Sequence, residues 1–138
     1  MAKKLENLDF LKNALRMLLG LFLIFAGISH LSWARQEFQA QVPSWVPLSI
    51  DLVVILSGIV EISLGAALIF LKAYRREVGL ITGIFFVMIF PGNVHQYLNG
   101  IDAFGLDSDR ARMIRLFFQP VLIFWAIWST KTKEEVQR

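Results

Sequence analysis

The stretch LSIDLVVILSGIVEISLGAALIFL, residues 48–71, decides the fold class of this chain. It is almost entirely apolar, and it has the length of about 17 to 25 residues that a helix needs to cross about 30 Å of hydrocarbon. Glu61 lies in its middle, about 15 Å below the outer end of the helix at about 1.5 Å of rise per residue. A carboxylate at that depth is costly unless it is paired, protonated or in contact with a ligand.

Three further stretches are long and apolar enough to cross a bilayer, which gives predicted spans at 14–33, 48–71, 78–97 and 111–128. The chain has 138 residues, of which 56% are hydrophobic. This composition lies outside the usual range of soluble domains. The sequence therefore predicts a single all-α domain over residues 1–138, an antiparallel four-helix transmembrane bundle with the lipid bilayer as its surroundings.

The basic residues predict the orientation of this bundle. An even number of spans puts both termini on one side, and most basic residues flank that side. An excess of basic residues marks the cytoplasmic side of a membrane protein, so we expect the N-in, C-in orientation. The basic residues on the cytoplasmic side are Lys3, Lys4, Lys12, Arg16, Lys72, Arg75, Arg76, Lys131, Lys133 and Arg138, and those on the other side are Arg35, Arg110, Arg112 and Arg115.

The composition also excludes several kinds of function. The chain has no cysteine, so disulfides, thiolate metal sites and dithiol redox chemistry are excluded, and a redox role needs a partner or a borrowed cofactor. His30, His95 and Glu61 are residue types that can bind metals, but their spacing matches no zinc motif. We predict no metal site and no covalent cofactor. The chain has no nucleic-acid-binding motif, so nucleic acid is not expected as a partner.

Prolines interrupt two regions of the predicted bundle. Pro43 and Pro47 flank Trp45 in the outer loop 31–49, so this loop cannot be one continuous helix. We expect it to lie over the bundle as a half-immersed lid. In the third span, Pro91 removes a backbone donor and leaves the Val87 carbonyl without its usual partner, which predicts a kink or a short unwound turn.

Polar residues from all the spans fall in the outer half of the bundle. Gly58, Glu61 and Gly65 stand at i, i+3 and i+7, on one helix face. Small residues there allow a neighbouring backbone to come close, and the first span offers Gly20 and Gly27. We expect an outer-half polar cavity that has Glu61 as its floor. The other residues expected at this cavity are His30, Ser57, Asn93, His95, Arg115 and Gln119.

Each of these residues also has a simpler interpretation. A protonated Glu61 can hydrogen-bond a backbone carbonyl or Asn93 and only fix the helix packing. His30 can be an ordinary buried or interfacial histidine, and Arg112 and Arg115 can anchor the helix to lipid headgroups. The convergence of several unrelated polar groups at one depth favours a ligand site.

Five stretches of the chain follow the order of motifs in a known family. They are LFLIFAGISHL (21–31), VPSWVP (42–47), LSGIVEISLGAALIF (56–70), FPGNVHQY (90–97) and RLFFQPVLIFWA (115–126). Over residues 15–128 the chain resembles the DoxX family of small four-helix membrane proteins. The resemblance implies a multi-pass protein of the bacterial cytoplasmic (inner) membrane, with Glu61, Asn93, Arg115 and Gln119 at positions of the family's polar pattern. Relatives are linked to thiosulfate:quinone oxidoreductase, to other membrane redox complexes, or to the assembly of nicotinic receptors.

We therefore predict a membrane subunit of a redox complex whose cavity binds a small lipophilic molecule with a polar head, with a quinone as the first candidate. Glu61 would exchange a proton or hydrogen bond with the head, and Asn93, Gln119 and His30 would orient it. Arg115 would stabilise a negative charge that develops on reduction. His95 and Ser57 are secondary candidates, and no residue is assigned a catalytic role, because the electrons must come from a partner protein.

Two alternatives remain open at this stage. The first is a non-catalytic scaffold or assembly chaperone that recruits another membrane protein through outward-facing Gly79 and Gly83. The second is a proton-coupled small-molecule carrier in which Glu61 is the coupling site. Four spans without an internal repeat give no obvious alternating-access pair, although a homo-oligomer would supply one.

Overall fold

The computed structural model of the chain describes residues 1–101 and 108–132, and these contain helices and no strand. Lys133 and Arg138, which contributed to the predicted orientation, lie outside the described residues. Four helices are long and apolar enough to cross a membrane, which confirms the predicted all-helical class. The elements are α1 (Ala2–Leu31), α2 (Arg35–Gln39), α3 (Ile50–Phe70), η1 (Lys72–Tyr74), α4 (Arg75–Leu98) and α5 (Asp109–Ser129).

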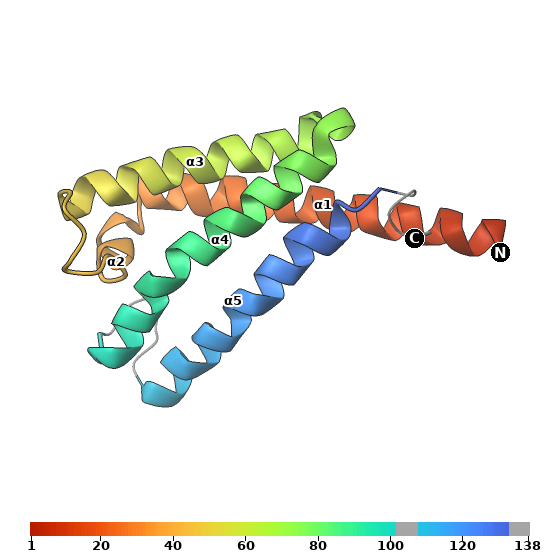
Figure 1. Ribbon diagram of the computed structural model, residues 1–138. Coiled ribbons are helices and arrows are strands. Elements are labelled where there is room, and N and C mark those ends of the chain that lie inside the picture. Colours follow the sequence, from red (N-terminus) through yellow and green to blue (C-terminus); the bar gives the residue numbers. More distant parts are fainter. Residues whose placement is uncertain (102–107, 133–138) are drawn as a thin grey trace.

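The predicted span boundaries agree with the helices within a few residues, except at the start of α1. This helix begins at Ala2, well before residue 14. The residues before Gly20 include no glycine or proline, so nothing in the sequence interrupts the helix. Its first turns extend beyond the other helices (Figure 1).

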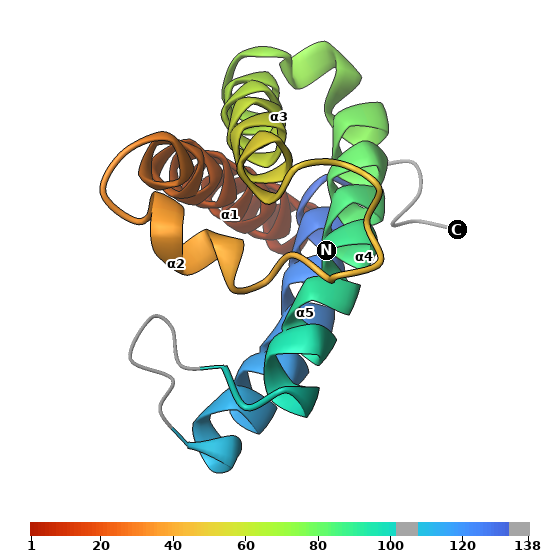
Figure 2. The ribbon, with the colours of Figure 1, turned by 90° about the vertical axis from the view of Figure 1, so that its left-hand side faces the viewer.

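The long helices form two pairs that cross obliquely. Helix α1 packs along α3, and α4 packs along α5 (Figures 1 and 2). One apolar core joins the pairs, and it takes residues from all four helices. The buried residues of this core are Leu19, Leu23, Leu64, Leu68, Val78, Phe86, Leu122 and Ala126.

Glycines set the close approach of α1 and α3. A Cβ atom added to Gly65 would lie 2.5 Å from the Gly20 carbonyl oxygen, and one added to Gly27 would lie 2.6 Å from the Gly58 carbonyl oxygen. The expectation that small residues bring these backbones together is confirmed. Rising residue numbers on α1 meet falling numbers on α3, so the two helices run in opposite directions.

Gly79 and Gly83 do not face outward, and the expectation of a recruiting surface at these two residues is wrong. Both are buried in α4. A Cβ atom added to Gly79 would collide with Thr130, and one added to Gly83 would lie 3.2 Å from Ile127 Cγ1. These small residues serve the packing of α4 on the C-terminal part of the chain, as small residues commonly do between membrane helices.

The unwound turn expected at Pro91 is absent, because α4 continues through this residue without interruption. Membrane helices tolerate proline where neighbouring groups satisfy the freed backbone. Near this point Gln119 of α5 donates from Nε2 to the Phe86 carbonyl at 2.7 Å, one residue before the Val87 carbonyl that Pro91 leaves without its helical donor.

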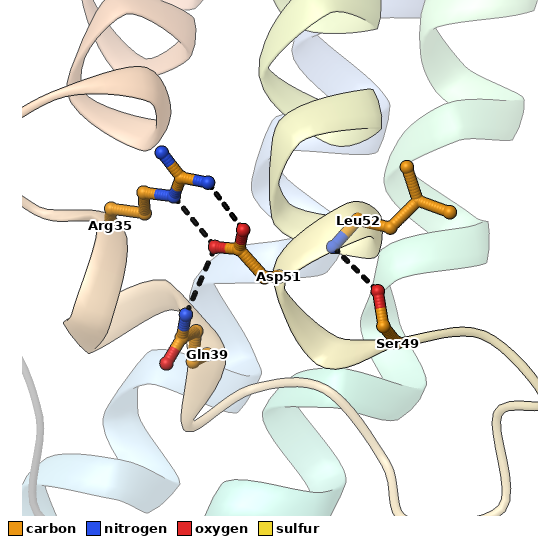
Figure 3. A network of polar contacts seen from close by, with 5 residues as sticks. All are labelled: Arg35, Gln39, Ser49, Asp51 and Leu52. Atoms are coloured by element: carbon orange, nitrogen blue, oxygen red, sulfur yellow. Dashed lines mark hydrogen bonds and ion pairs between the residues drawn. The ribbon is translucent and has the colours of Figure 1, made fainter.

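The outer connection between α1 and α3 contains α2 and is not one continuous helix, as Pro43 and Pro47 predict. Arg35 donates to both carboxylate oxygens of Asp51, with Nε 2.6 Å from Oδ1, and Gln39 Nε2 donates to Oδ1 at 3.2 Å (Figure 3). This clasp fixes α2 to the first turn of α3. Ser49 caps α3 by accepting a hydrogen bond from Leu52 N at 3.2 Å.

Candidate ligand cavity

A cavity of about 890 Å³ lies among α1, α3, α4, α5 and the loop after α2. Its volume is in the range of about 300 to 1,000 Å³ that small-molecule sites occupy. Most of the lining is aliphatic or aromatic. The polar side chains of the lining are His30, Gln41, Ser57, Glu61 and Arg115.

Glu61 and His30 form the polar centre of this cavity. Both side chains are buried, and His30 Nε2 lies 3.5 Å from Glu61 Oε2. The close backbone contact of Gly27 with Gly58 brings the two residues together, since His30 Cβ lies only 2.9 Å from the position of a Cβ on Gly58. Within the described chain, His30 Nδ1 and Glu61 Oε2 are buried and make no hydrogen bond of normal length, so Oε2 has only the longer contact with His30 Nε2. Buried polar atoms without full hydrogen bonding are costly, and two of them at one point favour a ligand site.

Arg115 links this centre to a second polar group between α4 and α5. Its guanidinium interacts electrostatically with Glu61, and its NH1 donates to Gln119 Oε1 at 3.1 Å. Gln119 Oε1 also accepts from Asn93 Nδ2 at 3.5 Å. Asn93 and Gln119 are buried and lie behind the lining, where they hold Arg115 in place.

The loop after α2 covers the outer end of the cavity. Gln41 Nε2 donates to Asn93 Oδ1 at 3.2 Å and to Gln96 Oε1 at 3.0 Å. The backbone of Gln41 lies directly against Gly92, where no side chain fits. Phe38 of α2 places its ring against the His30 ring, with 3.4 Å between the centroids. Together, α2 and the loop after it therefore contact both polar groups, which agrees with the expected lid.

The sequence profile of one protein family, described as a domain of unknown function (DUF8561), matches residues 19–130. The chain belongs to this family. No curated protein and no solved structure matches it. The DUF8561 match includes every lining residue of the cavity.

Most of the predicted site residues meet in this DUF8561 domain. His30, Ser57, Glu61 and Arg115 line the cavity, and Asn93 and Gln119 lie directly behind them. Arg115 bonds inward to Gln119, which favours the ligand site over the simpler interpretation as a headgroup anchor.

His95 lies away from the cavity of the DUF8561 domain. Its Nδ1 is 3.2 Å from Nδ2 of Asn99, the residue that follows the end of α4. Residues three apart share a helix face, and residues two apart do not. Asn93 and Gln96 therefore point to the loop, and His95 between them in sequence does not.

Two members of the polar network, Gln41 and Gln96, were not predicted. Gln96 was open to prediction, because it stands at i+3 from Asn93 in FPGNVHQY, on the same helix face. Gln41 sits in an irregular loop, where no periodicity indicates the direction of a side chain. Only the three-dimensional contact with Asn93 identifies it.

The polar side chains of the site are suited to hydrogen bonding and to interactions with charge. Among residues 1–101 and 108–132, no three His, Asp or Glu side chains lie close enough to hold a metal ion. The cavity offers an acid, an imidazole, a hydroxyl, an amide and a guanidinium. Such a set recognises a small polar head that both accepts and donates hydrogen bonds.

Proposed function

We propose that this protein binds a small lipophilic molecule with a polar head, of the quinone class, in the cavity at Glu61 and His30. The observation that carries the proposal is the contact of these two buried side chains inside an otherwise apolar cavity. Pockets with apolar walls and a few convergent polar groups are typical ligand sites. The resemblance of the sequence to the DoxX family supports the quinone as the first candidate.

The proposed chemistry assigns each polar residue a role. His30 and Arg115 donate hydrogen bonds to the carbonyl oxygens of a quinone head, and Glu61 exchanges a proton with the hydroxyl of the reduced form. Reduction of a quinone to a hydroquinone consumes two electrons and two protons. The protein therefore acts as the membrane subunit of a redox complex, in which a partner protein supplies the electrons and Glu61 passes protons.

The proposed location is the bacterial cytoplasmic membrane, as four antiparallel spans with both termini in the cytoplasm. The distribution of basic residues supports this orientation. Arg16 and Lys12 of α1 lie at the end of the molecule near η1, where Arg16 donates to the Leu68 carbonyl and Lys12 Nζ lies 5.2 Å from the Trp128 ring centre. Arg75 joins them there, with its NH1 3.1 Å from Asn13 Oδ1.

The two alternative functions have weaker support. A scaffold or assembly chaperone requires an outward surface, and Gly79 and Gly83 do not provide one because they pack against Thr130 and Ile127. A proton-coupled carrier would also use Glu61 and requires a second conformation. The retention of a bound lipophile separates the scaffold from ligand binding.

Mass spectrometry of lipid-soluble extracts tests the proposal. The protein is purified in mild detergent as wild type, as Glu61→Gln, and as Ser63→Ala. The last variant is a control on the same helix, because the exposed Ser63 bonds only to the Ile59 carbonyl in the described structure. We expect wild type and Ser63→Ala to retain a defined quinone or similar lipophile, and Glu61→Gln to lose most of it. Bulk phospholipid alone in all three samples would overturn the proposal in favour of the scaffold.

A further inference from the structure

Helices α3 and α4 leave a gap between them although they follow each other in sequence. Only η1 separates them, yet they contact each other far less than α3 contacts α1 or α4 contacts α5. Side chains of both helices along this gap line the cavity and are also exposed on the molecular surface. They are Leu56 and Val60 of α3, and Ile81, Ile84 and Met88 of α4.

The spacing of these residues places them in two stripes, one on each helix, and both stripes line the cavity. Leu56 and Val60 stand at i and i+4, and Ile81, Ile84 and Met88 stand at i, i+3 and i+7, so each set occupies one helix face. All five side chains are apolar, and Met88 is 72% exposed. At about 1.5 Å of rise per residue, Leu56 and Val60 lie about 9 to 15 Å below the outer end of α3. The gap therefore opens at the depth of the lipid hydrocarbon.

The outer, aqueous end of the cavity is covered. Gln41 bonds to Asn93 and Gln96 across that end, and the Arg35–Asp51 clasp holds α2 on α3. On the opposite side of the cavity, between α1 and α5, two exposed residues also reach the lining. These are Phe22 and Phe118.

We propose that the gap between α3 and α4 is a lateral portal through which one single-tailed lipophile exchanges with the hydrocarbon core of the bilayer, and that the tail stays in the portal when the head is bound. This inference rests on the proposed function for the identity of the head. Val60 at the portal and Glu61 at the head site line the same cavity, so a head held by Glu61 can place its tail between the two apolar stripes. A head with one tail fits this geometry, because the polar side chains gather around Glu61 and the stripes at the portal are apolar.

The cysteine-free sequence allows a direct test of the portal. A nitroxide spin label is attached to Ser57→Cys, inside the cavity, in protein reconstituted into phosphatidylcholine vesicles. Collision of the label with oxygen, which concentrates in hydrocarbon, and with a water-soluble nickel chelate is measured by electron paramagnetic resonance. We expect the oxygen collision rate to exceed the nickel rate several-fold. Ala26→Cys on α1, also in the lining, gives a second label position if the first variant does not fold.

A bulky side chain placed at the portal tests whether oxygen enters the cavity there. Ile84→Trp should lower the oxygen collision rate by at least half, whereas Leu21→Trp, on an exposed part of α1 outside the cavity lining, should leave it unchanged. A nickel rate above the oxygen rate would overturn the portal and place the opening toward water. A loss of oxygen contact in Phe118→Trp but not in Ile84→Trp would also overturn it, because the opening would then lie between α1 and α5.

The portal and the proposed function fail in different ways. If the label collides often with oxygen but the purified protein retains no defined lipophile, the result supports the portal and rules out quinone binding. If the protein retains a quinone but the label collides only with the nickel chelate, the result supports the proposed function and rules out the portal.

Discussion

His30 and Glu61 meet where glycines bring α1 and α3 close together, with Nε2 of the histidine 3.5 Å from Oε2 of the glutamate. Neither α1 nor α3 by itself brings these two side chains together. The contact requires Gly27 and Gly58, because any side chain at these positions would separate the two backbones. The contact of Glu61 with His30 thus depends on the small residues Gly27 and Gly58, which lie beside it in the α1–α3 interface.

This contact predicts a measurable coupling between the two residues. His30→Ala or Glu61→Ala alone leaves a buried polar partner unsatisfied, at a cost of about 1–3 kcal/mol each. The double variant removes both groups and should be destabilised by less than the sum, with a coupling of about 0.5–3 kcal/mol. Thermal unfolding of the four proteins in one detergent measures it. Additive losses would show that the contact contributes nothing to stability.

The glycine contacts predict different outcomes for similar substitutions. Gly65→Ala puts a Cβ 2.5 Å from the Gly20 backbone carbonyl oxygen, which cannot move without shifting α1. Overpacking of this kind costs about 1–3 kcal/mol, more than the gain of about 1 kcal/mol in helix propensity. Gly83→Ala is the matched control, because its Cβ meets a movable side-chain atom of Ile127 at 3.2 Å. We expect a lower melting temperature for Gly65→Ala and little change for Gly83→Ala.

The Arg35–Asp51 clasp predicts a local effect on α2. Arg35→Lys keeps the charge but cannot reproduce the two parallel hydrogen bonds to the carboxylate. Hydrogen exchange of the amides in α2 should become faster, while that of α1 and α3 should not change. Because both side chains are partly exposed, high salt should produce part of the same effect in wild type. Arg110→Lys, an exposed change on α5, is the control, and equal exchange in both variants would contradict the role of the clasp.

The proposed orientation is open to test by cysteine labelling, because the chain has no cysteine of its own. Ser44→Cys in the outer loop should react with a membrane-impermeant maleimide added to intact cells. Lys3→Cys, beside the N-terminus, should react only after the membrane is permeabilised. Both positions are exposed, so a difference in reaction reports the side of the membrane. The reverse pattern would show that the basic residues do not set the orientation of this protein.

The sequence predicted the helices better than it predicted the site. The length of the apolar stretches alone identified the long helices, because a helix needs about 20 apolar residues to cross a bilayer. The i, i+3 and i+7 spacing around Glu61 correctly placed Gly58 and Gly65 against α1, since that periodicity is a property of one helix. The direction of His95, the burial of Gly79 and the continuity of α4 through Pro91 depend on which helix lies opposite, and a single sequence does not contain that information. Gln41 is the clearest case, because its partners are Asn93 and Gln96, far away along the chain.

The lid predicts how water reaches the cavity. Gly92 lies directly under the Gln41 carbonyl, so Gly92→Ala pushes the loop away from α4 and leaves the helix itself intact or slightly more stable. Gln41→Ala removes the bonds to Asn93 and Gln96 without adding bulk. In both variants, a cysteine at residue 57 inside the cavity should react several-fold faster with a water-soluble maleimide.

The matched control for the lid is Gln36→Ala, a change of the same kind at an exposed position of α2 that does not line the cavity. Its rate should equal that of the protein with the cysteine alone. Faster reaction in Gly92→Ala together with unchanged unfolding temperature would show that the loop, and not the bundle, closes the aqueous end. Equal rates in all variants would mean that water already reaches Ser57 past the loop, and the outer end of the cavity would then have to be regarded as open.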